Sequence, residues 1–359
     1  MRTLVTGGSG FIGRYFHDVL TSRGDDVVIL DLVTPTWNTG NARFVRGDVR
    51  DPEAVASALT GCSRVLHLAA AHHDFGIEHD TYFDVNERGS RVVCDAMDAA
   101  GVTEACFYSS VAVYGDVPEP RHEDSPCKPV NPYGASKLAG EKVFRAWVDK
   151  GAGRRCLVIR PTITFGPRNF ANMYSLIRQV HSRKFVQVGP GRNIKSLSYV
   201  ENIVAFTMHA WQRQGRAALE TYNWVEKPDM DSATIASTIA RSLGRRGVGV
   251  RIPMWLALLG ALPFDLVIAL TGKNLPISSM RIRKFAGMQT KFESDRARAL
   301  GFSPAVSLAE GIDRMVRWFL AEGRHEQPVW HTPPAQVQKF SDQGPAVRAH
   351  DASAPAAVA

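Results

Sequence analysis

The feature that most constrains the fold of this chain is a glycine-rich turn between two regular elements at its N-terminus. Residues 2–6 are an apolar run typical of a buried strand, TGGSGFIG follows at 6–13, and residues 10–23 have helical spacing. Gly8, Gly10 and Gly13 fit the pattern G-x-G-x-x-G, whose glycines allow a tight turn and close approach of the backbone to a pyrophosphate. The pattern predicts a dinucleotide at the positive N-terminus of the helix.

Beyond this turn, the first half of the chain alternates between apolar strands and helices. Strands are expected over 27–31, 42–45, 64–68, 105–109 and 155–160, and helices over 51–59, 83–100 and 132–150. Such alternation implies parallel strands covered by helices. It predicts a Rossmann-type doubly wound parallel sheet of the α/β class.

The regular alternation ends near residue 165, where glycine, proline and asparagine become frequent. We therefore expect a cofactor-binding domain over 1–165, with later strands returning to it from 195–225. A smaller α/β region for the substrate is expected over 166–330, with a helix at 172–183. Residues 331–359 are rich in alanine, proline and polar residues, which predicts a disordered tail.

Two acidic residues at strand ends extend the expected cofactor site. Asp31 closes the second strand about 20 residues after the glycines, where a carboxylate accepts hydrogen bonds from the adenosine ribose. A carboxylate there repels a 2′-phosphate, so the sequence favours NAD over NADP. Asp48 and Val49 follow the third strand, where they could hold the adenine.

Two further stretches carry candidate chemistry. Tyr133 and Lys137 are four residues apart on an expected helix and therefore share a face. An ammonium near a phenol favours the phenolate, which can act as acid and base toward a substrate hydroxyl. Ser110 follows an expected strand, and ligand crevices form at the carboxyl ends of parallel strands.

These pieces together resemble the extended short-chain dehydrogenase/reductases, in particular their NAD-dependent nucleotide-sugar epimerase/dehydratase group. The resemblance covers about residues 1–320 and follows the order of the family. The matching pieces are TGGSGFIG at 6–13, Asp31, GDVRD at 47–51, HLAA at 67–70, Asn86, YSSVAVYG at 108–115, NPYGASKLAGE at 131–141, RPTITFGP at 160–167 and KSLSYVEN at 195–202.

The resemblance implies tightly held NAD and a catalytic set of Ser110, Tyr133 and Lys137. Tyr133 would be the base toward a sugar hydroxyl, Lys137 would bind the nicotinamide ribose, and Ser110, rather than Ser109, would orient the hydroxyl. The positions expected to contact the cofactor are Gly7, Gly10, Phe11, Ile12, Gly13, Asp31, Asp48, Val49, Leu68, Ala69, Ala70, Asn86, Tyr133, Lys137 and Pro161. Members are commonly homodimers through helices matching 83–100 and 132–150, and we expect the same here.

Departures from the family pattern narrow the expected reaction. Family 4,6-dehydratases carry an Asp-Glu pair directly after the catalytic serine or threonine, and decarboxylases carry a glutamate at the second of these positions. This chain has Val111 and Ala112 there. What remains is epimerisation of a nucleotide-sugar through a transient ketone, as in a UDP-sugar 4-epimerase, or simple oxidoreduction of an alcohol.

A second departure keeps an alternative open. Many sugar-nucleotide members have an asparagine where this chain has Ile163, so RPTITFGP also suits a 3β-hydroxysteroid or sterol dehydrogenase. A third interpretation is a non-catalytic protein that senses a dinucleotide. The loops that contain Arg168, Arg192 and Lys195 favour a diphosphate substrate, because basic side chains in loops beyond the active site can grip one.

The 359 residues carry 43 basic and 35 acidic side chains, a net charge of +8. Between Arg241 and Leu300 there are 11 basic and 3 acidic residues, so this segment accounts for the whole surplus. The charge is therefore no general coat for nucleic acid, and no nucleic-acid partner is expected.

The same segment contains the apolar stretch 252–272. A central aspartate costs about 2.5–3.5 kcal/mol in a bilayer, and Pro263 interrupts the stretch, so we expect two short buried or interfacial helices meeting at Pro263. Basic clusters flank it, among them Arg281, Arg283 and Lys284. The segment 252–284 could serve as a substrate lid, which we favour, or as a peripheral membrane contact.

Five cysteines occur without CxxC spacing or a histidine-rich partner motif. We expect buried reduced thiols, no disulfides and no metal site. The N-terminus lacks the features of a secretory signal. Together these features predict a cytoplasmic protein.

Overall fold

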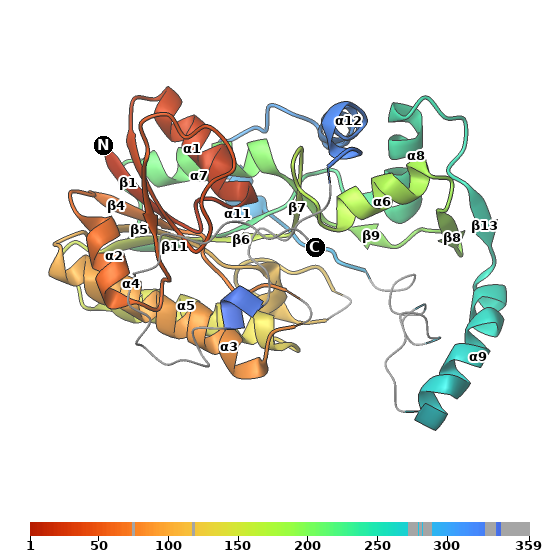
Figure 1. Ribbon diagram of the computed structural model, residues 1–359, viewed down its shortest axis with the longest axis horizontal. Coiled ribbons are helices and arrows are strands. Elements are labelled where there is room, and N and C mark those ends of the chain that lie inside the picture. Colours follow the sequence, from red (N-terminus) through yellow and green to blue (C-terminus); the bar gives the residue numbers. More distant parts are fainter. Residues whose placement is uncertain are drawn as a thin grey trace, which may run out of the picture.

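Seven parallel strands form the central sheet of the protein, in the order β11-β6-β5-β4-β1-β2-β3 (Figure 1). The computed structural model describes residues 1–73, 76–116, 119–271, 279, 282, 289–326 and 335–338. From β1, the strands β2 and β3 continue toward one edge of the sheet, whereas β4, β5 and β6 continue toward the other. Because the strand order reverses between β1 and β4, a crevice is expected outside the carboxyl end of β1. The strands are β1 (Arg2–Thr6), β2 (Asp26–Asp31), β3 (Arg43–Arg46), β4 (Arg64–His67), β5 (Glu104–Tyr108), β6 (Arg155–Pro161) and β11 (Leu219–Trp224).

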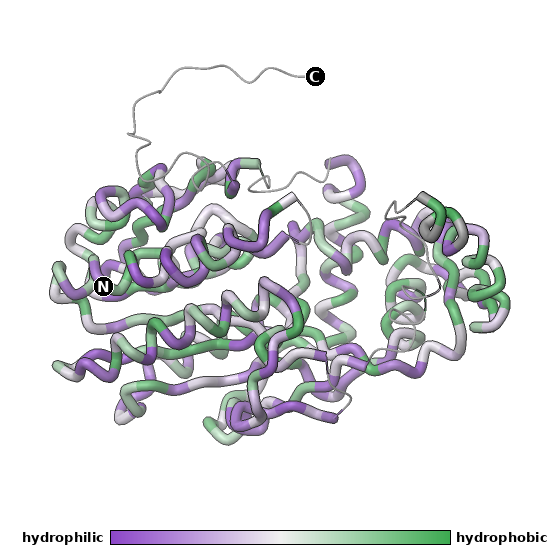
Figure 2. Tube along the Cα trace, turned by 90° about the horizontal axis from the view of Figure 1, so that it is seen from below, coloured by the Kyte–Doolittle hydropathy of each residue, from purple (hydrophilic) through white to green (hydrophobic). Residues whose placement is uncertain are grey.

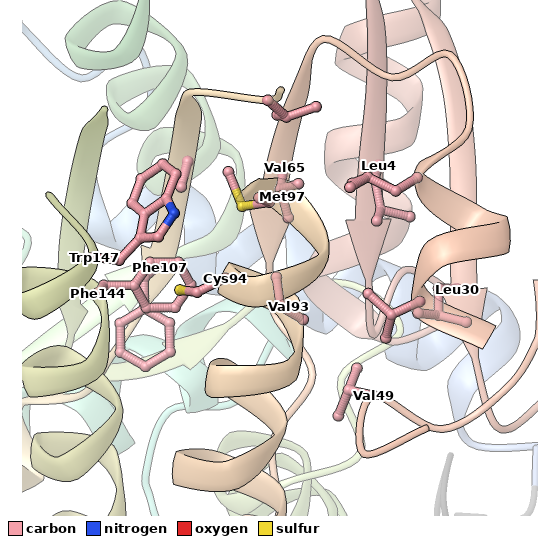
Figure 3. Close-up of a cluster of buried hydrophobic side chains, with 14 of the residues drawn as sticks. Leu4, Leu30, Val49, Val65, Val93, Cys94, Met97, Phe107, Phe144 and Trp147 are labelled. Carbon is pink, nitrogen blue, oxygen red and sulfur yellow. The ribbon is translucent and has the colours of Figure 1, made fainter. Parts of the chain in front are cut away.

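Helices cover both faces of this sheet, which confirms the doubly wound fold (Figure 1). The helices on one face are α1 (Phe11–Ser22), α7 (Val200–Gln212) and α11 (Asp295–Arg298), and those on the other are α2 (Pro52–Leu59), α3 (His79–Phe83), α4 (Gly89–Ala99) and α5 (Pro132–Asp149). Successive strand side chains point to opposite faces. Leu4 accordingly packs in the core under α2, α4 and α5, and Val5 in the core under α1 and α7. Figure 3 shows the first core, with Leu4 and Val65 from strands and Val93 and Met97 from α4.

A smaller region follows β6 and has its own core. Its helices are α6 (Asn172–His181), α8 (Ser232–Ser242), α9 (Met254–Thr271) and α12 (Leu308–Trp318), and its strand pairs are β7 (Ile163–Phe165) with β10 (Leu197–Tyr199), β9 (Ile194–Lys195) with β12 (Met230–Asp231), and β8 (Val186–Val188) with β13 (Val250–Ile252). Apolar side chains of α6, α8 and α12 pack together here. The strand that returns to the main sheet is β11, whereas β9 and β10 pair outside it.

One expected helix contains a π turn. Residues 83–99 are helical as expected, and the π-helical turn η1 (Asp84–Arg88) lies between α3 and α4 without a break in the helical backbone. A π turn accommodates one extra residue and often marks a functional position. Asn86, in this turn, is buried and holds the neighbouring loop, as described below.

The expected break at Pro263 is wrong. Helix α9 runs from Met254 to Thr271 with Pro263 inside it. A proline removes one backbone hydrogen bond and crowds the carbonyl four residues earlier, here that of Leu259. Both Leu259 and Pro263 are exposed, so water can satisfy the freed carbonyl.

Part of the expected tail is ordered. Residues 335–338 form a helical turn in which Val337 is buried, so the expectation of disorder does not hold for these four residues. The carbonyl of Val337 accepts a hydrogen bond from Arg50 Nη2 at 2.8 Å. The rest of 331–359 lies outside the described residues.

All five cysteines are free, as expected, and four of them are buried. Among the described residues, none of the helices is both long and apolar enough to span a membrane.

Candidate active site

The turn between β1 and α1 forms a cradle of backbone that has no room for side chains. Gly7 has φ +68°, and a Cβ there would lie 2.7 Å from the Ala69 nitrogen. A Cβ on Gly13 would lie 2.4 Å from the Gly8 carbonyl oxygen. The hydroxyl of Ser9 is buried without a hydrogen-bond partner among the described residues. An unpaired donor beside the open N-terminus of α1 fits a pyrophosphate.

Asp31 stands next to this cradle at the end of β2. Its Oδ2 accepts a hydrogen bond from the Ser9 nitrogen at 3.1 Å, and its Oδ1 accepts one from the Val33 nitrogen at 3.2 Å. The side chain is 6% exposed. The structure thus brings the predicted ribose carboxylate to the predicted pyrophosphate turn.

We expect Asp31→Ala to weaken NAD binding about 10- to 100-fold, because a hydrogen bond to a charged group contributes about 1.5–3 kcal/mol. NADP binding should change far less, since the substitution also removes the repulsion of a 2′-phosphate. Calorimetric titration of cofactor-free protein measures both affinities, with Asp26→Ala at the exposed start of the same strand as the control. Equal losses for NAD and NADP would refute the ribose role.

The segment after β3 is organised by a buried arginine that the sequence did not single out. Arg50 is fully buried and donates to both oxygens of Asp48, at 2.9 Å from Nε and 2.7 Å from Nη2. Its Nη1 donates to Asp84 at 2.9 Å. Asp48 is therefore fixed in place, while the Val49 side chain packs in the core. The pattern G-D-V-R at residues 47–50 predicted a cofactor contact in this segment. It did not show that Arg50 holds Asp48 in place.

The remaining expected cofactor positions lie at the same edge of the sheet. Phe11 and Ile12 form the first turn of α1, Leu68, Ala69 and Ala70 follow β4, and Pro161 ends β6. Asn86 holds this edge together. Its amide exchanges two hydrogen bonds with the backbone of Ala71, at 2.8 and 3.0 Å, and donates to Ser136 Oγ at 2.8 Å. Asn86 thus joins the loop after β4 to the helix of Tyr133.

Two neighbouring serines after β5 have different surroundings. Ser109 is buried, and its hydroxyl donates to Glu141 Oε1. Ser110 caps the short helical turn η2 (Val111–Tyr114), and its Oγ accepts from the Ala112 nitrogen at 3.1 Å. Ser110 also lines a pocket. The Ser109 hydroxyl is thus engaged in an interior hydrogen bond, whereas Ser110 borders the pocket.

Close backbone packing joins this turn to α5, the helix of Tyr133 and Lys137. Asn131 caps α5 by accepting from the Gly134 nitrogen at 2.7 Å. A Cβ on Gly134 would lie 2.4 Å from the Ala112 carbonyl oxygen, so only glycine fits there. Tyr133 directly precedes Gly134, and Ser110 directly precedes η2, so the contact brings together the two backbone segments that carry these catalytic candidates.

Lys137 lies one turn further along α5 and is 2% exposed. Its Nζ lies 4.6 Å from the centroid of the Phe107 ring. Burial lowers the pKa of Lys137 to about 7, although the charge of Glu141 acts in the opposite direction. Burial and the charge of Lys137 also lower the pKa of His67 to about 3, so His67 is neutral at physiological pH.

The lowered pKa of Lys137 predicts a pH dependence of stability in cofactor-free protein. From about pH 7 upward the folded state releases the Lys137 proton, whereas the unfolded state keeps it to about pH 10.5. Raising the pH therefore favours folding. The free energy of unfolding should rise by about 2 kcal/mol more between pH 7 and pH 9 than in Lys137→Met. Urea titrations at both pH values measure the difference. An equal change in the free energy of unfolding in wild type and in Lys137→Met would contradict the lowered pKa of Lys137.

A pocket of about 260 Å³ lies beside Ser110. Its lining combines two cations, Arg121 and Lys291, and one carboxylate, Asp116, with apolar side chains that include Ile163 and Phe292. Tyr133 and Lys137 are not in its lining, but Ala112, against which Gly134 packs, is. Of the three catalytic candidates, Ser110 therefore borders the pocket directly.

The three basic residues expected to bind substrate do not line this pocket. Arg168 is exposed in the loop after β7 and has φ +70°. Arg192 is exposed, and Lys195 lies in β9, where burial lowers its pKa. Sequence reasoning missed Arg121 and Lys291, because loops far apart in the chain bring them to the pocket. Their roles and those of the three predicted residues remain predictions.

Comparison with known proteins agrees with this geometry. Residues 3–223 match the family described as the NAD dependent epimerase/dehydratase family. The chain is 36% identical over 321 residues to N-acetyl-alpha-D-glucosaminyl-diphospho-ditrans,octacis-undecaprenol 4-epimerase of Escherichia coli O157:H7, covering 88% of this chain and 94% of the relative. It is 28% identical over 369 residues to 3beta-hydroxysteroid-dehydrogenase/decarboxylase isoform 1 of Arabidopsis thaliana, covering 90% and 81%.

Solved structures show the same fold. The UDP-glucose 4-epimerase of Thermus thermophilus, crystallised in complex with NAD, superposes with a TM-score of 0.70 at 24% identity, covering 90% of this chain and all of that one. The family match spans the glycine turn, the catalytic candidates and the sheet. This chain is an NAD-dependent enzyme of the extended short-chain dehydrogenase/reductase type and belongs to the NAD-dependent epimerase/dehydratase family.

Proposed function

We propose that the protein is a 4-epimerase of a sugar joined to a diphosphate, such as a UDP-sugar, and that it acts through a transient ketone. One observation carries the proposal. Ser110 lines the pocket and is joined to the helix of Tyr133 and Lys137, while the next two positions are Val111 and Ala112. Elimination of water needs a further acid and base, and neither of these side chains is one. The Escherichia coli relative, a 4-epimerase, supports the same reaction.

In the proposed reaction, Tyr133 takes the proton of the C4 hydroxyl while Ser110 holds that oxygen by a hydrogen bond. NAD, when bound, supplies a reversible acceptor for the hydride that leaves C4. The Lys137 ammonium stabilises the phenolate of Tyr133 and can bind the nicotinamide ribose. Once the ketone has rotated in the site to present its other face, Tyr133 would return the proton to the C4 oxygen, and return of the hydride to that face would complete the inversion at C4. No atom is gained or lost overall, as an epimerisation requires.

The pocket cations suit the diphosphate of such a substrate. Guanidinium and ammonium groups form strong hydrogen bonds to phosphate oxygens, and Arg121 and Lys291 provide one of each. The Nε of Arg121 is buried without a partner among the described residues. An apolar part of the substrate can also pack against Ile163 in the pocket lining, since this residue is 39% exposed.

The test is a substrate panel, with proton NMR following the configuration at C4. UDP-N-acetylglucosamine, N-acetylglucosaminyl-diphospho-undecaprenol and a 3β-hydroxysteroid are each incubated with the holoenzyme. Interconversion at C4 of either diphosphate-linked sugar supports the proposal and identifies the carrier. Oxidation of the steroid alone, with both sugars unchanged, would overturn it in favour of the dehydrogenase alternative.

We also propose that the enzyme is a cytoplasmic homodimer that pairs through α4 and α5. The five free cysteines and the NAD dependence suit a reducing compartment rich in this cofactor. Sedimentation velocity tests the dimer directly, and a single monomeric species at micromolar concentration would contradict it.

A further inference from the structure

Helix α9 exposes large apolar side chains to an unusual degree. Trp255 is 66% exposed, Leu259 is 55% exposed and Leu270 is 77% exposed. In Figure 1 the helix projects from the smaller region, and Figure 2 shows this end of the molecule as predominantly hydrophobic. A helix whose exposed side is apolar is expected to bind another apolar surface, of a protein or of a membrane.

The exposed apolar side chains cover a broad side of α9, since Leu256, Phe264 and Val267 are exposed as well. Within that side, Trp255, Leu259, Leu262 and Leu270 follow one another at helical spacing and form a stripe. The opposite side is covered by the protein itself, since Ala257 and Ala261 are buried. The stripe therefore faces outward because α9 is fixed on its other side.

In the sequence, basic residues flank the stripe rather than interrupt it. Asp265 is the one charged residue in the sequence of α9, and its Oδ1 accepts a hydrogen bond from the Ser279 nitrogen at 3.0 Å. Arg246 and Arg251 are exposed just before the helix. In the sequence after it come Lys273, Arg281, Arg283 and Lys284, which lie outside the described residues. Residues 241–300, which include this helix, account for the whole positive surplus of the chain.

We propose that α9 docks the enzyme on an anionic membrane surface, with its stripe in the interfacial layer and Arg246 and Arg251 on lipid headgroups. Apolar area and cations contribute together to such binding, and tryptophan favours this layer. The helix lies on the membrane rather than across it, because no described helix is suited to span one. The sequence alone favoured a substrate lid, but no described residue of α9 lines the pocket.

The docking itself does not depend on the proposed function. The purpose of the docking does rest on the proposed function. A docked 4-epimerase would bind a diphosphate-linked sugar carried by a membrane lipid without extracting the lipid from the bilayer. The relative that acts on an undecaprenyl-linked sugar matches the chain over 88% of its length.

Vesicle co-sedimentation of the full chain tests the docking without requiring turnover. Wild type should bind vesicles of phosphatidylcholine and phosphatidylglycerol and bind pure phosphatidylcholine far more weakly. Leu259→Gln with Leu262→Gln should weaken binding by about 100-fold or more, from the apolar burial lost. Arg246→Ser with Arg251→Ser should weaken it by about fivefold for each cation, and high salt should have a similar effect.

Val186→Thr, at a half-exposed valine outside α9, is the matched control and should bind as wild type does. NAD binding by each variant verifies that it folds. Failure of wild type to bind anionic vesicles, or equal binding by the leucine variant, would overturn the proposal. A wild-type dimer that the leucine variant splits into monomers, without vesicle binding, would show that a second copy of the chain covers α9 instead. Epimerisation of UDP-N-acetylglucosamine is measured without vesicles, so failure of the proposed function is seen separately.

Discussion

Replacement of Tyr133 by phenylalanine should lower turnover by about 10³-fold, because a positioned acid–base group contributes about 10²–10⁴-fold. The substitution removes one hydroxyl from the first turn of α5 and leaves the packing of Gly134 on Ala112 unchanged. NAD binding should therefore stay close to that of wild type. Steady-state turnover and cofactor titration of the same preparation measure both quantities.

Tyr108→Phe is the matched control for this prediction. Tyr108 lies in β5, the strand that leads to Ser110, and its buried hydroxyl bonds to Thr207 Oγ1 at 2.7 Å. Its loss should cost about 1 kcal/mol of stability and leave turnover nearly unchanged. Turnover retained in Tyr133→Phe, or lost equally in both variants, would remove Tyr133 from its assigned role.

Replacement of Glu141 by alanine should lower the free energy of unfolding by about 3–5 kcal/mol, the usual cost of leaving one partner of a buried ion pair alone. Arg160 grips Glu141 with two hydrogen bonds, from Nε to Oε1 at 2.8 Å and from Nη2 to Oε2 at 2.6 Å. Burial by itself lowers the pKa of Arg160, but the hydrogen bonds and charge of Glu141 outweigh it and raise that pKa. Urea denaturation measures the loss.

The double variant Glu141→Leu with Arg160→Met should recover most of that stability, because it removes the guanidinium that the single variant leaves buried without its carboxylate. Its turnover should stay low, since Glu141 also receives the hydroxyl of Ser109 and so holds the strand end before Ser110. Glu310→Ala, which breaks an exposed pair with Arg314, is the control and should cost less than about 1 kcal/mol. If Glu141→Ala loses no more free energy of unfolding than Glu310→Ala, the buried pair of Glu141 and Arg160 does not stabilise the fold.

Much of the fold follows from local sequence patterns. The turn 6–13 and the alternation of strands and helices through β6 predict the doubly wound sheet, because each pattern depends on near neighbours in the chain. The π turn inside the helix expected at 83–100 could not be predicted in this way. It places Asn86 against Ala71 and Ser136, and these contacts join three separate segments.

The candidate site shows the same division. Ser110, Tyr133 and Lys137 lie in motifs, whereas Arg121 and Lys291 meet in the pocket through a parallel bridge between Arg121 and Phe292. That bridge joins residues 171 positions apart, so no local pattern reports it. Helix α9 is a third case: the sequence shows an apolar stretch, and only the structure shows which of its side chains are exposed.

The most direct test of the central claim is the fate of the C4 hydrogen during turnover. A diphosphate-linked N-acetylglucosamine with deuterium at C4 is converted by the holoenzyme in ordinary water, and mass spectrometry measures the label in the product. Hydride transfer to bound NAD and back predicts that the epimerised sugar keeps its deuterium at C4. Loss of the label to solvent, or epimerisation by protein stripped of NAD, would contradict the account.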